Sequence, residues 1–190
     1  PRTGDVERVP LDASDPEGPD VGSVATLTVD RRGWLWVGTR SGLLRVNPTT
    51  RRCERVDLPG ERVLAVSSIL DGAGGELWLG TSDSTLLRFD PAGGSLARFE
   101  LPPELKATGA DAEHLFWTSL VASSSEELLV GFCSSGLFRF NRAEGRFAPL
   151  DPELNRLLRS HRRLVTSMAR DDAGDLWVCT YDGGLVRVPA

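Results

Sequence analysis

The sequence predicts an all-β fold, a β-propeller of four blade units with four antiparallel strands each. Three observations carry this prediction: a motif that recurs four times, a spacing typical of one blade, and short apolar runs separated by turn-forming residues. The motif is a Leu-Trp-Val-Gly-Thr element followed within a few residues by Gly-Leu-x-Arg-x-Asn. Its equivalent positions are 36, 78, 129 and 177, so neighbouring copies are 42, 51 and 48 residues apart.

The first strand of each unit is rich in apolar and β-branched residues, which favour a half-buried pleated surface. Turns follow three of these strands, at Asp30–Gly33, Asp71–Gly75 and Asp171–Gly174. Asp accepts hydrogen bonds from nearby backbone in such turns, and Gly takes a positive φ. The four predicted first strands are Val24–Val29, Leu64–Leu70, Trp117–Ala122 and Val165–Arg170.

The second strand of each unit carries the Trp-Val-Gly-Thr element, and the third carries Leu-x-Arg-x-Asn. We expect the recurring Trp residues to fill the wedge between neighbouring blades, and the recurring Arg to pair with a neighbouring strand or carboxylate. The Trp residues are Trp34, Trp36, Trp78 and Trp177, and the Arg residues are Arg45, Arg88, Arg139 and Arg187. Fourth strands are predicted at Glu54–Leu58, Leu96–Leu101 and Arg146–Leu150.

A short helix is predicted in the long connection that follows the third unit. Asp151 is suited to the N-cap and Pro152 to the first helical position. Leu154, Leu157 and Leu158 then fall on one face of that helix, which we expect to pack on the propeller.

The blade units are expected at residues 21–58, 62–101, 115–150 and 164–190, within one domain over 1–190. The last unit stops after its third strand, while Glu7–Leu11 matches Glu54–Leu58 in four of five residues. Two arrangements therefore stay open. Residues 5–11 complete the last blade and close a four-bladed ring, or the chain is a four-blade fragment of a seven- or eight-bladed ring.

The composition excludes several function classes. The formal net charge is -5, which disfavours nucleic acid as a partner. No apolar stretch approaches the roughly 18 residues that span a bilayer, so no membrane contact is expected within the chain. The three cysteines, Cys53, Cys133 and Cys179, lack any CxxC spacing, which argues against a disulfide framework or a zinc site.

The residues from Asp30 to Asn47, and again from Asp171 to Val188, resemble the two-component regulator propeller repeat. The resemblance covers nearly the whole chain in four copies, with three departures: Thr85 in place of Gly, Leu129 in place of Trp, and Phe132 in place of Thr. It implies a periplasmic or other extracytoplasmic sensor domain of a bacterial signal-transduction protein.

Catalysis requires a poised acid, base or nucleophile, and the chain has only two histidines, both in long connections. The leading hypothesis is therefore a non-catalytic sensor or interaction domain with no cofactor and no bound metal. Its partner would be a small molecule, a glycan fragment or a protein, with self-association also open. The alternatives are a propeller enzyme of the streptogramin-lyase type, which needs His and Glu on adjacent blades, and a purely structural assembly module.

Candidate binding residues lie on the face formed by the long connections between blades. The basic run at the end of the predicted helix could hold an anionic ligand or an acidic partner. The turns between second and third strands reach the same face. The candidates are Arg159, His161, Arg162, Arg163, His114, Trp117, Arg40, Asp83 and Tyr181.

Overall fold

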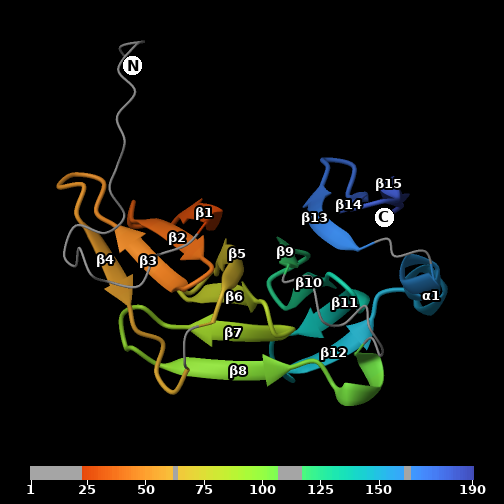
Figure 1. The fold of residues 1–190 in the computed structure, drawn as a ribbon, viewed down its shortest axis with the longest axis horizontal. Helices are drawn as coiled ribbons and strands as arrows, with labels where there is room; N and C mark the ends of the chain where they lie inside the picture. The colour runs from red at the N-terminus through yellow and green to blue at the C-terminus, as the bar shows by residue number, and fades with distance from the viewer. Residues whose placement is uncertain (1–22, 62–63, 107–116, 161–163) are drawn as a thin grey trace, which may run out of the picture.

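The structure is a computed structural model and describes residues 23–61, 64–106, 117–160 and 164–190. Four small antiparallel sheets follow one another along the chain (Figure 1). The first holds β1 (Val24–Val29), β2 (Leu35–Thr39), β3 (Gly42–Val46) and β4 (Cys53–Val56). The second holds β5 (Val66–Asp71), β6 (Leu77–Thr81), β7 (Thr85–Phe89) and β8 (Leu96–Glu100).

The third sheet holds β9 (Thr118–Ala122), β10 (Glu127–Phe132), β11 (Gly136–Asn141) and β12 (Arg146–Pro149). The fourth holds β13 (Val165–Arg170), β14 (Leu176–Thr180) and β15 (Gly184–Val188). A short 3-10 helix, η1 (Pro103–Leu105), and one α-helix, α1 (Pro152–Ser160), follow the second and third sheets. Strands pair in chain order within every sheet, which confirms the predicted all-β blade architecture.

Several strand boundaries differ from the prediction. The fourth strands end at Val56, Glu100 and Pro149, before the predicted Leu58, Leu101 and Leu150. The strand expected from Leu64 begins at Val66, where pairing with Thr81 starts next to a bulge. The strand expected from Trp117 begins at Thr118, because Trp117 contributes only its carbonyl, which accepts the Cys133 N–H at 3.0 Å. The strand predicted at residues 5–11 lies outside the described residues, and the described part of the fourth sheet has three strands.

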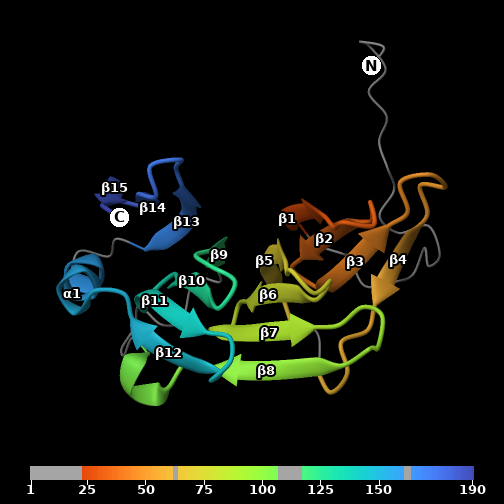
Figure 2. The same ribbon diagram turned by 180° about the vertical axis from the view of Figure 1, so that it is seen from behind.

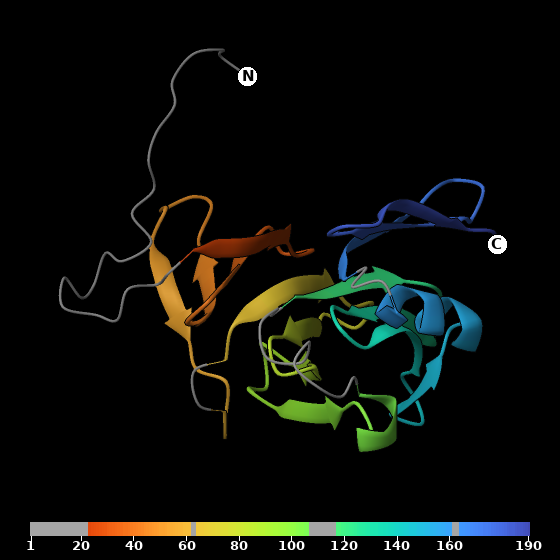
Figure 3. The ribbon, with the colours of Figure 1, turned by 45° about the vertical axis from the view of Figure 1, so that its right-hand side comes forward.

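The sheets are arranged as an arc, with the first strand of each sheet on its inner side (Figures 1 and 2). These inner strands contact one another in the order β1, β5, β9, β13. Figure 3, a view turned by 45°, shows the first and fourth sheets standing at the two ends of the arc. The described residues thus form an open series of four blades rather than a closed four-bladed ring.

The core lies in the wedges between consecutive sheets. One buried cluster surrounds Trp36, a second surrounds Trp78, and a third contains Leu129 and Met168. Trp34 and Trp177 are only partly buried, but Trp36 and Trp78 are almost completely buried, which confirms the predicted packing between blades for Trp36 and Trp78. Large rings bury more apolar area than aliphatic side chains, so these two residues anchor the first two wedges.

A glycine in the second strand lets consecutive sheets approach closely. A Cβ added at Gly38 would lie 2.6 Å from the Val66 carbonyl oxygen, and one added at Gly80 would lie 2.6 Å from the Thr118 methyl. A Cβ at Gly131 would lie 2.8 Å from a Val165 methyl. The inner strand of each following sheet therefore packs directly against this glycine.

The fourth sheet departs from that rule, because exposed Cys179 occupies the position of the glycine. Leu185, which is equivalent to the 1% exposed Leu43, is 60% exposed. At the other end of the arc, Leu27 and Val29 of β1 are exposed as well. Leu27 and Leu185 are thus exposed at the two ends of the arc, whereas their counterparts in the inner sheets, Ile69 and Leu137, are buried.

Helix α1 begins as predicted. The Asp151 carboxylate accepts the Glu153 and Leu154 backbone N–H groups at 2.8 and 3.0 Å, and Pro152 takes the first position. The predicted apolar face is wrong in one residue, since Leu157 is 43% exposed while Leu158 is buried. The packed face instead includes Asn155, whose amide bonds the Leu137 N–H at 2.7 Å and the Leu137 carbonyl at 2.8 Å. Among the described residues, no helix is both long and apolar enough to cross a membrane.

Candidate functional site

The structure describes the side chains of only some of the sequence-predicted site residues. His114, His161, Arg162 and Arg163 lie outside the described residues. Arg159 belongs to α1, but its side chain is likewise not described. Trp117 directly precedes β9 and is 41% exposed. The basic cluster remains a prediction.

The other three candidates occupy turns between the second and third strands of different sheets: Arg40 in the first, Asp83 in the second, and Tyr181 in the fourth. Arg40 and Tyr181 are exposed. Asp83 accepts hydrogen bonds from the Thr81 hydroxyl at 2.6 Å and from the Arg98 guanidinium at 2.8 Å. Burial acts to raise the pKa of Asp83, but these hydrogen bonds outweigh it and hold the pKa below its ordinary value.

Arg98, which the sequence did not single out, organises this side of the molecule. Its guanidinium bonds Glu61, Asp83 and Glu100 at 2.8 to 2.9 Å. Burial acts to lower the pKa of Arg98, yet the three carboxylates raise it above its ordinary value. Because Glu61 lies in the connection from the first sheet to the second, these ion pairs link the two sheets. The Asp83 carboxylate is already bound by partners within the protein.

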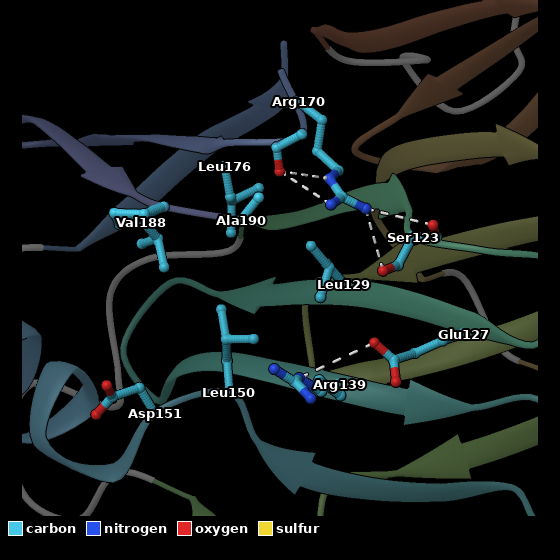
Figure 4. Close-up of a pocket in the computed structure, with 12 residues that line it drawn as sticks. Ser123, Glu127, Leu129, Arg139, Leu150, Asp151, Arg170, Leu176, Val188 and Ala190 are labelled. Atoms are coloured by element: carbon cyan, nitrogen blue, oxygen red, sulfur yellow. Dashed lines mark hydrogen bonds and ion pairs between the residues drawn. The ribbon is translucent and has the colours of Figure 1, made fainter. Parts of the chain in front are cut away.

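A pocket of about 370 Å³ lies between the third and fourth sheets (Figure 4). We call it the inter-blade pocket. Its apolar lining comes from Leu129, Leu150, Leu176 and Val188, and its charged lining includes Glu127, Arg139, Asp151 and Arg170. This volume is within the range of small-molecule sites in proteins.

The inter-blade pocket occupies a place that aromatic rings fill in the second wedge. There Trp78, Phe99 and Phe140 contact one another, with ring centroids 5.9, 5.5 and 4.9 Å apart. The same places in the third wedge are taken by Leu129, Leu150 and Val188.

Strand register establishes this equivalence. Trp78 pairs with Arg88 as Leu129 pairs with Arg139. Phe140 and Val188 each pair with the residue that directly precedes the Trp position of their own sheet, Leu128 and Leu176. Phe99 pairs with Leu86, and the Leu150 N–H bonds the carbonyl of the equivalent Leu137 at 2.9 Å.

The first wedge is also aromatic. The Trp36 and Phe89 rings meet edge to face, with centroids 6.5 Å apart and an interplanar angle of 79°. The space beside them, lined also by Arg45 and Val56, is about 210 Å³. A Trp-Phe pair is thus present in two wedges and replaced by Leu and Val in the third, where the largest of these spaces opens.

Two of the charged groups around the pocket are engaged by the protein itself. Arg170 donates to the Gly174 carbonyl and to the Ser123 carbonyl and hydroxyl at 2.9 to 3.3 Å, and so bridges the third and fourth sheets. Asp151 caps α1. Glu127 and Arg139 are joined more loosely, with 4.0 Å between the Arg139 Nε and the Glu127 carboxylate. These two groups can therefore turn toward a ligand at little cost.

Within the part of the chain that the structure describes, no group of three or more His, Cys, Asp or Glu side chains is placed to hold a metal ion. Cys53 and Cys133 are buried and Cys179 is exposed. Burial raises the pKa of the Cys133 thiol to about 11, so this thiol is protonated at neutral pH.

Comparison with known proteins gives a likeness of fold. No protein-family model and no curated protein sequence matches the chain. Among solved structures, the extracellular domain of the putative hybrid two-component system BT3049 from B. thetaiotaomicron matches 94% of this chain with a TM-score of 0.68 and 16% identity. The extracellular domain of the putative one-component system BT4673 from the same organism matches 87% with a TM-score of 0.65 and 19% identity.

A virginiamycin B lyase from Staphylococcus aureus, solved in a catalytically inactive form with quinupristin, matches 91% of the chain with a TM-score of 0.62 and 16% identity. The chain spans 21 to 22% of the length of the two extracellular domains and 57% of that of the lyase. Its blade fold is therefore shared by extracellular domains of putative one- and two-component systems and by an enzyme.

Proposed function

We propose that the chain is a non-catalytic part of an extracytoplasmic sensor ring in a bacterial signal-transduction protein, and that its inter-blade pocket receives a small ligand. The observation that carries the proposal is a ligand-sized pocket at a wedge whose counterparts are filled by aromatic rings. The likeness to extracellular domains of one- and two-component systems supports the sensor role.

The position of the pocket supports a sensing mechanism. A ligand held between Leu129 of the third sheet and Val188 of the fourth buries surface on both, and so stabilises their packing by mass action. The wedge has two walls on separate sheets, joined at the turns by Arg170. Occupancy is therefore expected to stiffen the relative placement of neighbouring blades, a change that the rest of a ring can transmit.

Ligand binding is tested by a thermal-shift screen of the chain against aromatic compounds, organic acids and oligosaccharides. The proposal expects at least one compound to raise the melting temperature of the wild-type chain and to have no effect on Leu129→Trp, whose ring fills the pocket. If no compound raises the melting temperature, a purely structural module is favoured. A hit that survives Leu129→Trp would move the site elsewhere, for example to the basic run that ends at Arg163.

The extracytoplasmic location is tested with a cysteine introduced at Tyr181, a turn residue that is 69% exposed. The native Cys179 is unsuitable, because its position is the one that the next blade of a ring would cover. A maleimide that does not cross membranes should label Tyr181→Cys more strongly than the wild type in intact spheroplasts. Labelling that appears only after lysis would place the domain inside the cell.

The fold likeness to virginiamycin B lyase gives a second candidate, a propeller enzyme. Incubation with quinupristin, followed by mass spectrometry, separates the two candidates. The sensor proposal expects quinupristin to stay intact, and its conversion would favour the enzyme.

A further inference from the structure

The inter-blade pocket retains the surroundings of a tryptophan side chain without the side chain itself. In the three sheets that carry the Trp, an acidic side chain accepts the indole N–H. Asp30 accepts from Trp36 at 2.8 Å, Glu76 from Trp78 at 3.3 Å, and Asp171 from Trp177 at 2.8 Å. An indole buried without such a partner would leave a polar N–H unsatisfied.

The third sheet keeps the acceptor although it has lost the indole. Glu127 precedes Leu129 by two residues, as Glu76 precedes Trp78. The Glu127 carboxylate lines the pocket, and the nearest described cation is the Arg139 guanidinium at 4.0 Å, beyond hydrogen-bond distance. Figure 4 shows both side chains at the same wall of the pocket, below Leu129.

One of the two cations over the tryptophan ring is retained as well. The Arg142 guanidinium lies 5.6 Å, and the Arg88 guanidinium 6.0 Å, from the centroid of the Trp78 ring. Arg139 is equivalent to Arg88, since it pairs with Leu129 as Arg88 pairs with Trp78. A planar aromatic ring in the place of the missing side chain would therefore lie beneath Arg139, where cation–π attraction favours it.

The apolar walls match the same occupant. Leu129, Leu150 and Val188 stand where Trp78, Phe99 and Phe140 meet, so the wedge has lost the volume of three rings and kept aliphatic surfaces on each side. Figure 4 shows Leu150 and Val188 facing this space from the two sheets. Burial of a flat apolar ring there would restore the contacts that the second wedge makes internally.

We infer that the inter-blade pocket binds an indole-type ligand, a planar aromatic heterocycle whose ring N–H is accepted by Glu127 and whose face lies against Arg139. The inference rests on the proposed function, in that it names the chemical class of the small ligand that the pocket receives. It assigns Glu127 to recognition of the N–H, and Leu129, Leu150 and Val188 to contact with the ring.

The experiment is a calorimetric titration of the wild-type chain with indole and with N-methylindole, which has the same ring system but no N–H. We expect indole to bind about tenfold more tightly, which corresponds to one hydrogen bond to a charged acceptor. Glu127→Ala should remove this preference by weakening indole and leaving N-methylindole unchanged. Equal affinity of the two compounds for the wild type would overturn the inference.

Leu129→Trp should abolish binding of both compounds, because its own ring takes their place. Leu185→Trp, a matched Leu to Trp change at an exposed position of the fourth sheet, should bind indole as the wild type does. Val188→Phe fills the wedge from the other side and provides a second test if Leu129→Trp does not fold. Indole binding that survives both filled variants would place the site elsewhere.

The outcomes separate the inference from the proposed function. If neither indole nor N-methylindole binds, but another class of compound binds and is blocked by Leu129→Trp, the indole assignment is wrong and the ligand-binding function stands. If no compound that the filled variants block can be found, both fail.

Discussion

The second and third wedges of the molecule have the same close contact between sheets but are lined by different side chains. In both, the inner strand of the following sheet packs on a glycine, Gly80 or Gly131. The second wedge is filled by the rings of Trp78, Phe99 and Phe140, whereas the third has aliphatic side chains and a pocket of about 370 Å³. The repeat thus sets how closely sheets approach, while the outer part of each wedge varies independently.

Two contacts explain why the sheets of the third wedge keep their spacing although this wedge has no aromatic rings at these positions. The close contact of Gly131 with Val165 and the bridge from Arg170 to Ser123 hold the sheets at two separate points. The aliphatic side chains of this wedge pack into the cluster around Leu129 and leave the pocket open beside them. A repeat architecture can therefore open a pocket by substitutions alone, without an inserted loop.

The largest expected contrast comes from truncating the two equivalent residues. Trp78→Ala should cost about 3–5 kcal/mol of unfolding free energy, because it empties a wedge packed on every side. Leu129→Ala should cost about 2 kcal/mol, since one side of Leu129 already faces the pocket. Urea denaturation of both variants measures the difference. Equal losses would contradict the view that the third wedge is underpacked.

The shared backbone is tested by adding a methyl group at the close contact. Gly131→Ala should cost about 1–3 kcal/mol, because its Cβ would lie 2.8 Å from Val165. Cys179→Ala, at the equivalent position of the fourth sheet, should change the stability by less than about 0.5 kcal/mol, since Cys179 is exposed. Thermal denaturation measures both variants. A harmless Gly131→Ala would show that the sheets approach less closely than described.

Filling the pocket should stabilise the chain. Leu129→Trp is expected to gain about 0.5–2 kcal/mol, because the new ring occupies an open space and its N–H can be accepted by Glu127. The matched control is Leu86→Phe in the buried cluster around Trp78, which should lose about 1–3 kcal/mol through overpacking. If both enlargements destabilise the chain equally, the wedges do not differ in packing.

The smallest effect concerns acid. Asp83 has a lowered pKa, so its contribution to stability is present above its ordinary pKa and is lost as the pH falls through the folded value. The stability advantage of the wild type over Asp83→Asn should therefore shrink from about pH 5 to about pH 2. The change should stay below about 1 kcal/mol, because solvent screens this partly exposed network. If the difference in stability is constant across this range, the ion pairs of Asp83 do not contribute to the stability of the first two sheets.

Particular residues show which features of the fold could be predicted from the sequence. The Asp151 cap and the pairing of second and third strands followed from local patterns, and both are confirmed. The burial of Asn155 in place of Leu157 did not, because it depends on the Leu137 backbone, 18 residues away. A polar residue on a predicted helix gives no sign of a distant hydrogen-bond partner.

Only part of the pocket could be predicted from the sequence. The replacement of Trp by Leu129 was evident from the repeat, but Leu150 and Val188 lie on a fourth strand and in the next repeat, where alignment gives no reason to group them. Only the register of β11 with β12 and the packing of consecutive sheets bring the three together. A systematic comparison of wedge positions across repeats would have detected the loss of all three rings.

The most direct test is a crystal structure of the chain soaked with bromoindole, with the bromine located by its anomalous signal. The account predicts a bromine peak between Leu129 and Val188 in the wild type, with the ring N–H directed at Glu127, and no peak there in Leu129→Trp. A peak at another place on the molecule, with the inter-blade pocket closed or occupied only by water, would contradict it.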